Sequence, residues 1–220
     1  YMGLNRYKEN DDRHAVIKKW FETFYLRNKS PSRAPYFGLD HGWYWPAILD
    51  NQLNGRSSIN LIKSIIKQLQ IEIFEDGSIK NRTTRGNRAL WYHHDGMKEI
   101  MISLEIARRH GVSIPLSLDA KVKKAGEIFI KGFMDHSYLN RWAKVAHNAI
   151  YVEDEQEFKE NLNDIPNGNS WFHIYAYRYP NSEITHQLRT LLQIENSNSA
   201  SKDAMIGFGL GCLYSAASDY

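Results

Sequence analysis

The sequence predicts an all-α protein, and three observations favour this class. Apolar residues recur at intervals of three and four along most of the 220 residues, which is the spacing of one face of an α-helix. No segment shows the strict alternation of polar and apolar residues that a half-buried strand requires. Glycine, proline and asparagine stand between the helical segments, where they end one helix and begin a connection. Paired helices of this kind build bundles, solenoids or α/α toroids.

Three helices are predicted in the first third of the chain. The first covers 14–28, where apolar and aromatic residues recur every four positions. A short helix follows over 46–53, with Pro46 in its first turn. The third begins after Ser57 or Ser58, because either hydroxyl can accept a hydrogen bond from the first turn. Its buried face is expected to contain Leu61, Ile62, Ile65, Ile66, Leu69 and Ile73.

Two long amphipathic helices are predicted after a turn at Asp76-Gly77. They cover 88–109 and 117–134, and Gly111 together with a following proline separates them. The residues expected in the core are Met97, Ile100, Met101, Leu104 and Ala107 of the first helix and Leu118, Val122, Ala125, Phe129 and Phe133 of the second.

The last third of the chain begins with the polar stretch 150–169, which is typical of a long loop or a short helix. Further helices are predicted near 170–178, 182–194 and 203–216. Alternating glycines in the last of these indicate close packing of its backbone against a neighbour.

The composition bounds the class of protein. With 42% hydrophobic and 24% charged residues, the chain is globular, and its length suits one domain over residues 1–220. It has 28 basic and 25 acidic residues, without the dense Lys/Arg stripe of a nucleic-acid-binding protein, so no nucleic-acid partner is expected. Cys212 is the single cysteine and cannot form an intrachain disulfide. No apolar run approaches a membrane span, and no zinc, phosphate-loop or dinucleotide motif predicts a metal or cofactor.

The segment 81–95 contains the densest group of chemically active side chains. Arg85, Arg88 and Tyr92 are spaced by three and four residues, so a helical segment would place them on one face. A guanidinium near a phenol favours the charged form of the phenol, which suits a tyrosine that removes and returns a proton. The alternative is a solvated helix start followed by a buried, hydrogen-bonded tyrosine.

A second group lies upstream, at 39–46. It contains Asp40, His41 and the aromatic residues Trp43, Tyr44 and Trp45. Aromatic rings bind the apolar C–H faces of sugars, so Trp43 and Tyr44 are candidate carbohydrate contacts. The alternative is that they pack on the first turn of the next helix, and Trp45 is expected in the core.

Together the two groups resemble a known family. The run RGNRALWYH at 85–93 resembles the RGxRALxYH segment of the α/α-toroid alginate lyases. Residues 40–45 are similar to the NHxYW segment of that family, and residues 170–180 to its WLEPY…YP helix. The order and approximate spacing of these segments agree over residues 14–194.

The resemblance implies an incomplete (α/α) toroid or barrel of antiparallel helical hairpins. Members of the family are longer, and the matching part is their C-terminal half to two-thirds. The implied protein is a periplasmic or secreted polysaccharide lyase that acts on an anionic polysaccharide, spans no membrane and needs no metal or cofactor.

The implied reaction is β-elimination at a uronic acid. Tyr92 would serve as the acid and base, His41 would help to neutralise the uronate carboxylate, and Arg85 would bind that carboxylate through two hydrogen bonds. Asp40, beside His41, completes the implied catalytic group. The implied substrate-binding residues are Arg88, Trp43, Tyr44, Trp91 and His93.

Asp40 departs from the family pattern, which has asparagine at this position. An asparagine donates a hydrogen bond to the substrate carboxylate, whereas an ionised aspartate repels it. A related uronate polymer, such as a glucuronan, is therefore an alternative to alginate. Two other functions stay open: a non-catalytic carbohydrate-binding domain in polysaccharide export, and a glycoside hydrolase that uses Asp40 or Asp95 as its acid.

Overall fold

The computed structural model describes residues 57–145, 149–158 and 169–191, together with the single positions 15, 16, 19 and 23. These residues form helices, turns and irregular segments, and their only strand-like pairing is one isolated bridge between Ile73 and Ile79. The elements are α3 (Ile59–Glu72), η2 (Gly86–Arg88), α4 (Ala89–Arg109), α5 (Leu116–Met134), η3 (His136–Leu139), α6 (Asn140–Ala143), α7 (Ser170–Arg178) and α8 (Glu183–Leu191). The all-α class is therefore confirmed over the described residues.

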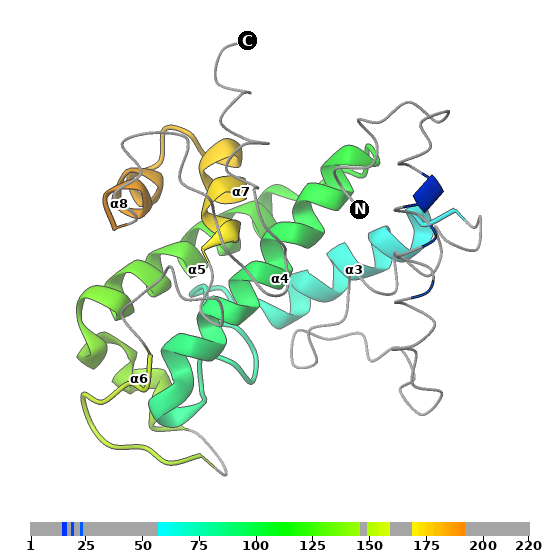
Figure 1. Cartoon of the computed structure of the whole chain (residues 1–220). Coiled ribbons are helices and arrows are strands. Elements are labelled where there is room, and N and C mark those ends of the chain that lie inside the picture. Colours follow the sequence, from blue (N-terminus) through cyan, green and yellow to red (C-terminus); the bar gives the residue numbers. More distant parts are fainter. Residues whose placement is uncertain are drawn as a thin grey trace.

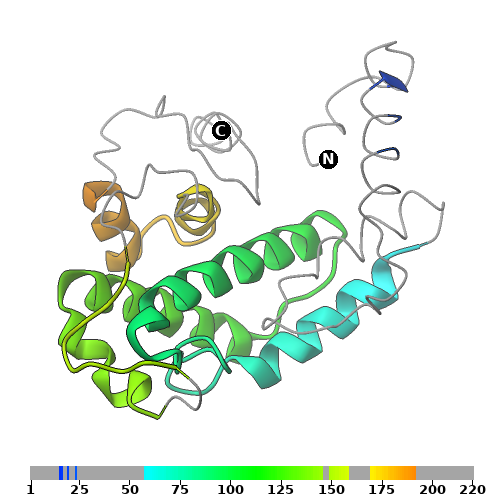
Figure 2. The same cartoon turned by 60° about the horizontal axis from the view of Figure 1, so that its bottom comes forward.

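Helix α4 lies at the centre of this part of the molecule. It packs against α3, α5 and α7, and α8 packs against α5 and α7. The helices α3, α4 and α5 alternate in direction, because the chain reverses after α3 and again after α4 (Figure 1). Figure 2 shows α7 and α8 beside α4 and α5, away from α3. None of the described helices is both long enough and apolar enough to cross a membrane.

The bounds of the three long helices agree closely with those predicted from the sequence. Gly111 ends α4 with a φ of 66°, in the left-handed region that favours glycine. The predicted core residues of these helices are buried, except Leu61 and Phe133, which are partly buried against the core. The short elements η3 and α6 were not predicted. The predicted helices over 46–53 and 203–216 lie outside the described residues.

An aromatic cluster joins α4, α5 and α7. His94, Phe129, Trp171 and Phe172 are buried, and the Trp171 indole Nε1 donates a hydrogen bond of 3.1 Å to His94 Nδ1. Phe158, from the irregular segment 149–158, packs with its ring centroid 5.4 Å from that of His94. Each such aromatic pair adds about 0.5–1.5 kcal/mol beyond the burial of its area. The cluster therefore anchors the end of the 149–158 segment to the helices.

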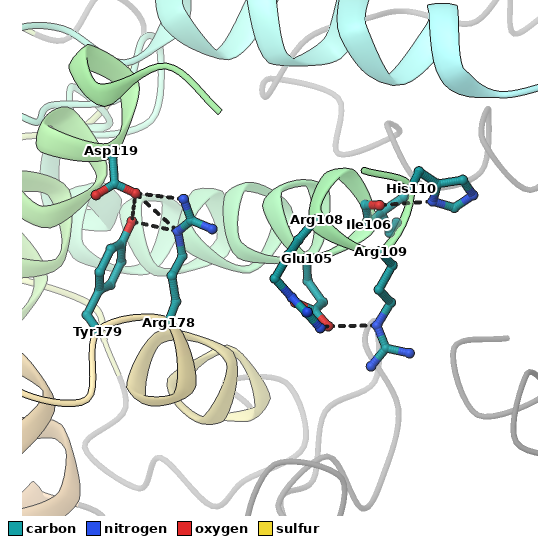
Figure 3. Close-up of polar contacts among 8 residues, drawn as sticks. All are labelled: Glu105, Ile106, Arg108, Arg109, His110, Asp119, Arg178 and Tyr179. Atoms are coloured by element: carbon teal, nitrogen blue, oxygen red, sulfur yellow. Dashed lines mark hydrogen bonds and ion pairs between the residues drawn. The ribbon is translucent and has the colours of Figure 1, made fainter. Parts of the chain in front are cut away.

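A polar contact fixes the end of α7 against the start of α5 (Figure 3). Arg178 Nη2 lies 2.7 Å from Asp119 Oδ1, and the Tyr179 hydroxyl donates to the same oxygen at 2.8 Å. Burial raises the pKa of Asp119, but the hydrogen bonds from Arg178 and Tyr179 outweigh it, so this pKa lies below its ordinary value. The carboxylate is thus held in its charged form between the two helices.

A second polar group closes the C-terminal end of α4 (Figure 3). The buried Glu105 carboxylate accepts two hydrogen bonds of 2.8 Å from Arg108 and one of 2.6 Å from Arg109. A buried carboxylate is tolerated when charged donors satisfy its oxygens. The two arginines also place positive charge where the helix dipole is negative.

Candidate functional site

The candidate residues lie where the chain turns into α4. Residues 80–84 form turns, η2 follows, and α4 begins at Ala89. Gly86, the first residue of η2, has a φ of 57°, and a Cβ atom added there would lie 2.0 Å from the carbonyl oxygen of Ile150. A side chain at this position would be strained and would also collide with the 149–158 segment. The glycine of the RGNRALWYH run is thus required by the close approach of a distant backbone.

Asn87 connects η2 to the 149–158 segment through three hydrogen bonds. Its N–H donates to the Ile150 carbonyl at 2.9 Å, and its carbonyl accepts from the N–H of Glu157 at 2.6 Å. Its side-chain Oδ1 accepts from the N–H of Val152 at 2.6 Å. The backbone of this segment is therefore fixed beside the start of α4.

Gln156 completes this connection with its side chain. Its Oε1 accepts a hydrogen bond of 2.9 Å from the N–H of Leu90, in the first turn of α4. Its Nε2 donates to the Gly86 carbonyl at 3.1 Å. The first N–H groups of a helix have no partner within the helix, so Gln156 supplies a cap from far along the chain.

Tyr92 lies in the first turn of α4 and is partly exposed. The guanidinium carbon of Arg85 lies 4.7 Å from the centroid of its ring. The Arg85 Nε donates a hydrogen bond of 2.6 Å to the carbonyl of Asn81, which orients the guanidinium over the ring. The structure therefore brings together Arg85 and Tyr92, as their spacing predicted.

Arg88 is the second cation beside Tyr92. Its Nε lies 2.6 Å from Glu157 Oε2, and both side chains are about half exposed, 56% for Arg88 and 44% for Glu157. The hydrogen bond and the charge of Glu157 raise the pKa of Arg88, and Tyr92 contributes in the same direction. Tyr92 thus lies close to two guanidinium groups, one of which already holds a carboxylate.

The predicted substrate contact of His93 is wrong for this structure. The side chain is fully buried, with Nδ1 2.8 Å from Thr83 Oγ1 and Nε2 2.8 Å from the Ala125 carbonyl. Burial lowers the pKa of His93 to about 4. Both ring nitrogens are occupied by the protein, so His93 holds the start of α4 against α5 instead of facing a ligand.

Trp91 and Asp95 lie on other sides of α4. Trp91 is partly buried and packs against the hydrophobic core. Asp95 lies 3.6 Å from Arg82 Nη1 and 3.3 Å from the buried Lys98 Nζ. Trp91 is thus engaged in packing, and Asp95 links Arg82 of the preceding turn to Lys98 of α4.

The second predicted group lies outside the described residues. Asp40, His41, Trp43 and Tyr44 belong to it, and the structure places none of them relative to Tyr92.

Sequence reasoning missed Glu157, Asn87 and Gln156, which shape the site. Glu157 and Gln156 lie in the polar stretch 150–169, for which the sequence predicted a long loop or a short helix and no site residue. Asn87 lies within the run at 85–93, but nothing in its local sequence indicates that it will bind residues of the 149–158 segment. Among the described residues, no group of histidine, cysteine and acidic side chains could hold a metal ion.

The geometry of the site rests on Arg85, Arg88, Tyr92 and Glu157, all within or against the first turn of α4. Comparison of the sequence with protein-family models and with curated proteins finds no match.

Proposed function

We propose that the chain is a polysaccharide lyase that cleaves a uronic-acid-containing polysaccharide, alginate or a related exopolysaccharide, by β-elimination. The observation that carries the proposal is the position of the Arg85 guanidinium, 4.7 Å from the centroid of the Tyr92 ring, with Arg88 beside the same tyrosine. A proton-transferring phenol close to two cations is an arrangement that suits an anionic substrate.

The reaction needs a group that transfers protons and a cation that binds the uronate carboxylate. A base removes the C5 proton of the uronate, the electron pair forms the C4–C5 double bond, the C4–O4 bond breaks, and O4 takes up a proton. Tyr92 exchanges these protons in the proposal. Arg85 binds the uronate carboxylate and so stabilises the negative charge that develops beside C5. His41 shares that task, and the step requires no metal or cofactor.

The proposal extends to the fold and the location of the protein. The alternating directions of α3, α4 and α5 are those of helical hairpins, and we propose that they form part of an (α/α) toroid. A lyase of this kind meets its polymer in the periplasm or outside the cell, which is the proposed location.

The glycoside hydrolase alternative has less support among the described residues. Asp95, one of its two candidate acids, lies within 3.6 Å of Arg82 and 3.3 Å of Lys98, and these contacts account for its position. The other alternative, a non-catalytic carbohydrate-binding domain, is distinguished from a lyase by the following experiment.

The test is the ultraviolet absorbance of the unsaturated product, measured with a panel of polyuronates. Tyr92→Phe should reduce kcat by at least about 10²-fold, since it removes the proton-transferring hydroxyl. Tyr177→Phe is a matched control, because Arg108 lies 5.3 Å from the centroid of the Tyr177 ring, at the opposite end of α4 from Tyr92. Full activity of Tyr92→Phe would refute its role. Binding of polyuronate without absorbing product would indicate the carbohydrate-binding alternative, and new reducing ends without absorbance would indicate a hydrolase.

A further inference from the structure

The ion pair between Arg88 and Glu157 places a carboxylate of the protein directly on the candidate site. The Arg88 Nε lies 2.6 Å from Glu157 Oε2, and Tyr92 is in contact with the same guanidinium. A uronate carboxylate has the same charge and the same planar shape as the Glu157 side chain. The two groups therefore fit the same donors on Arg88.

The backbone of Glu157 is fixed, whereas its side chain is not. The Glu157 N–H donates to the Asn87 carbonyl at 2.6 Å, and the next residue, Phe158, is buried in the aromatic cluster with His94. The side chain itself is 44% exposed, and a surface ion pair is readily exchanged. The Glu157 carboxylate can thus leave Arg88 by rotation of its own side chain, while the 149–158 segment stays in place.

We infer that Glu157 is a specificity-determining residue that occupies Arg88 in the absence of substrate and yields it to a carboxylate of the polyuronate. This inference rests on the proposed function. After the exchange, Glu157 stays close to Arg88 because its backbone is held by Asn87. Its negative charge then opposes a second substrate carboxylate at this position, so the site accepts one carboxylate at a time.

The experiment compares Glu157→Gln with the wild-type chain. The substitution keeps the size of the side chain and its backbone contact, but removes the charge that competes for Arg88. The KM for a polyuronate should fall about two- to fivefold, which is the range of a half-exposed ion pair. The difference should shrink as salt is added, because salt screens charges that are exposed to solvent.

Glu127→Gln provides a matched control. Glu127 pairs with Lys131 on α5, and the two side chains are 45% and 49% exposed, close to the values of the Arg88–Glu157 pair. Both variants change the net charge of the protein by the same amount. An equal fall of KM in both would show a general effect of charge and would overturn the inference, as would an unchanged or higher KM in Glu157→Gln.

A binding measurement separates this inference from the proposed function. Calorimetry with a uronate oligosaccharide, in the Tyr92→Phe background where cleavage is blocked, should show tighter binding when Glu157→Gln is added. A methyl-esterified oligosaccharide, which lacks the charge, should bind equally to both proteins. If the wild-type chain cleaves no polyuronate but the added substitution still tightens binding, the proposed cleavage fails, while the competition between Glu157 and a uronate carboxylate for Arg88 stands. If the substitution leaves the affinity for the charged oligosaccharide unchanged, the inference fails whatever the activity.

Discussion

Nδ1 of His93 lies 2.8 Å from Oγ1 of Thr83, and this contact joins the turn before α4 to the helix itself. The same threonine oxygen accepts a hydrogen bond of 2.8 Å from the N–H of Ile79. On the other side of the ring, Nε2 lies 2.8 Å from the carbonyl of Ala125 in α5. Because a carbonyl only accepts, Nε2 carries a proton. Burial lowers the pKa of His93, which favours the neutral ring, and in the neutral ring Nδ1 accepts from the Thr83 hydroxyl. The position of Tyr92, the preceding residue, depends on this chain of contacts.

Protonation of His93 should destabilise the protein as the pH falls. Burial lowers the pKa of His93 from 6.5 to about 4 in the folded state, so between these values the unfolded chain binds the proton more readily. The contribution is fully present above pH 6.5 and is lost as the pH falls towards 4. At pH 5 the loss from this group is on the order of 2 kcal/mol. Urea unfolding at several pH values should show the loss, and His93→Gln should flatten the profile. An NMR titration of His93 with a midpoint near its ordinary value would contradict the explanation.

Replacement of Gly86 by alanine should lower the free energy of unfolding more than replacement of Gly111 by alanine. Both glycines have a positive φ, 57° and 66°, so alanine is strained at either position. Only at Gly86 would the added Cβ meet another atom, the Ile150 oxygen at 2.0 Å, whereas nothing lies within 4 Å at Gly111. Gly111→Ala should cost about 1 kcal/mol of the free energy of unfolding, and Gly86→Ala at least about 2 kcal/mol more. Urea denaturation of the two variants measures the difference, and equal values would disprove the close approach of Ile150.

Arg85→Lys should lower the proposed activity although it keeps the charge. A lysine ammonium lacks the planar pair of donors that binds a carboxylate through two hydrogen bonds, and it stacks less well on an aromatic ring. We expect kcat/KM for the best polyuronate to fall by roughly 10-fold or more, which is the scale of one charged hydrogen bond. Arg108→Lys is the control, because its guanidinium lies 5.3 Å from the centroid of the Tyr177 ring, at the opposite end of α4 from Tyr92. Unchanged kinetics in Arg85→Lys would show that Arg85 contacts no substrate.

The contact between α5 and α7 should depend on the charge of Asp119. Asp119→Ala leaves the hydroxyl of the buried Tyr179 without its acceptor and should cost about 1–3 kcal/mol of the free energy of unfolding. Asp119→Asn keeps an acceptor and should cost less. Because the folded pKa of Asp119 is lowered, its contribution is present above its ordinary pKa of 3.8 and is lost as the pH falls below that value. Thermal unfolding at two pH values checks both statements, and a larger loss in Asp119→Asn than in Asp119→Ala would contradict them.

The helices were predictable because each one carries its own pattern. In α4, the spacing of Met97, Ile100, Met101 and Leu104 fixes the buried face without reference to any other segment. The pairing of Arg85 with Tyr92 could be predicted for the same reason, since both lie in one local stretch. The buried role of His93 could not be predicted in this way. It depends on the side of the helix on which His93 lies, and on a carbonyl that α5 supplies.

Glu157 and Gln156 could not be assigned to the site from the sequence. They lie 69 and 70 positions from their partners Arg88 and Gly86. Nothing in the composition of a polar loop identifies the carbonyl or the guanidinium that it will meet. Only the packing of Phe158 among the helices decides which side chains of this segment reach the start of α4.

The three hydrogen bonds of Asn87 have a consequence for the order in which the molecule assembles. They join the backbone and side chain of Asn87 to backbone groups more than sixty positions further along the chain. Closing so large a loop is opposed by chain entropy, whereas the hairpin of α4 and α5 needs only a short connection. We therefore expect the helices to fold first and the first turn of α4 to gain its cap only when the 149–158 segment docks. The surroundings of Tyr92 are completed late, and the amide of Asn87 should exchange with solvent together with that of Glu157, as one cooperative unit.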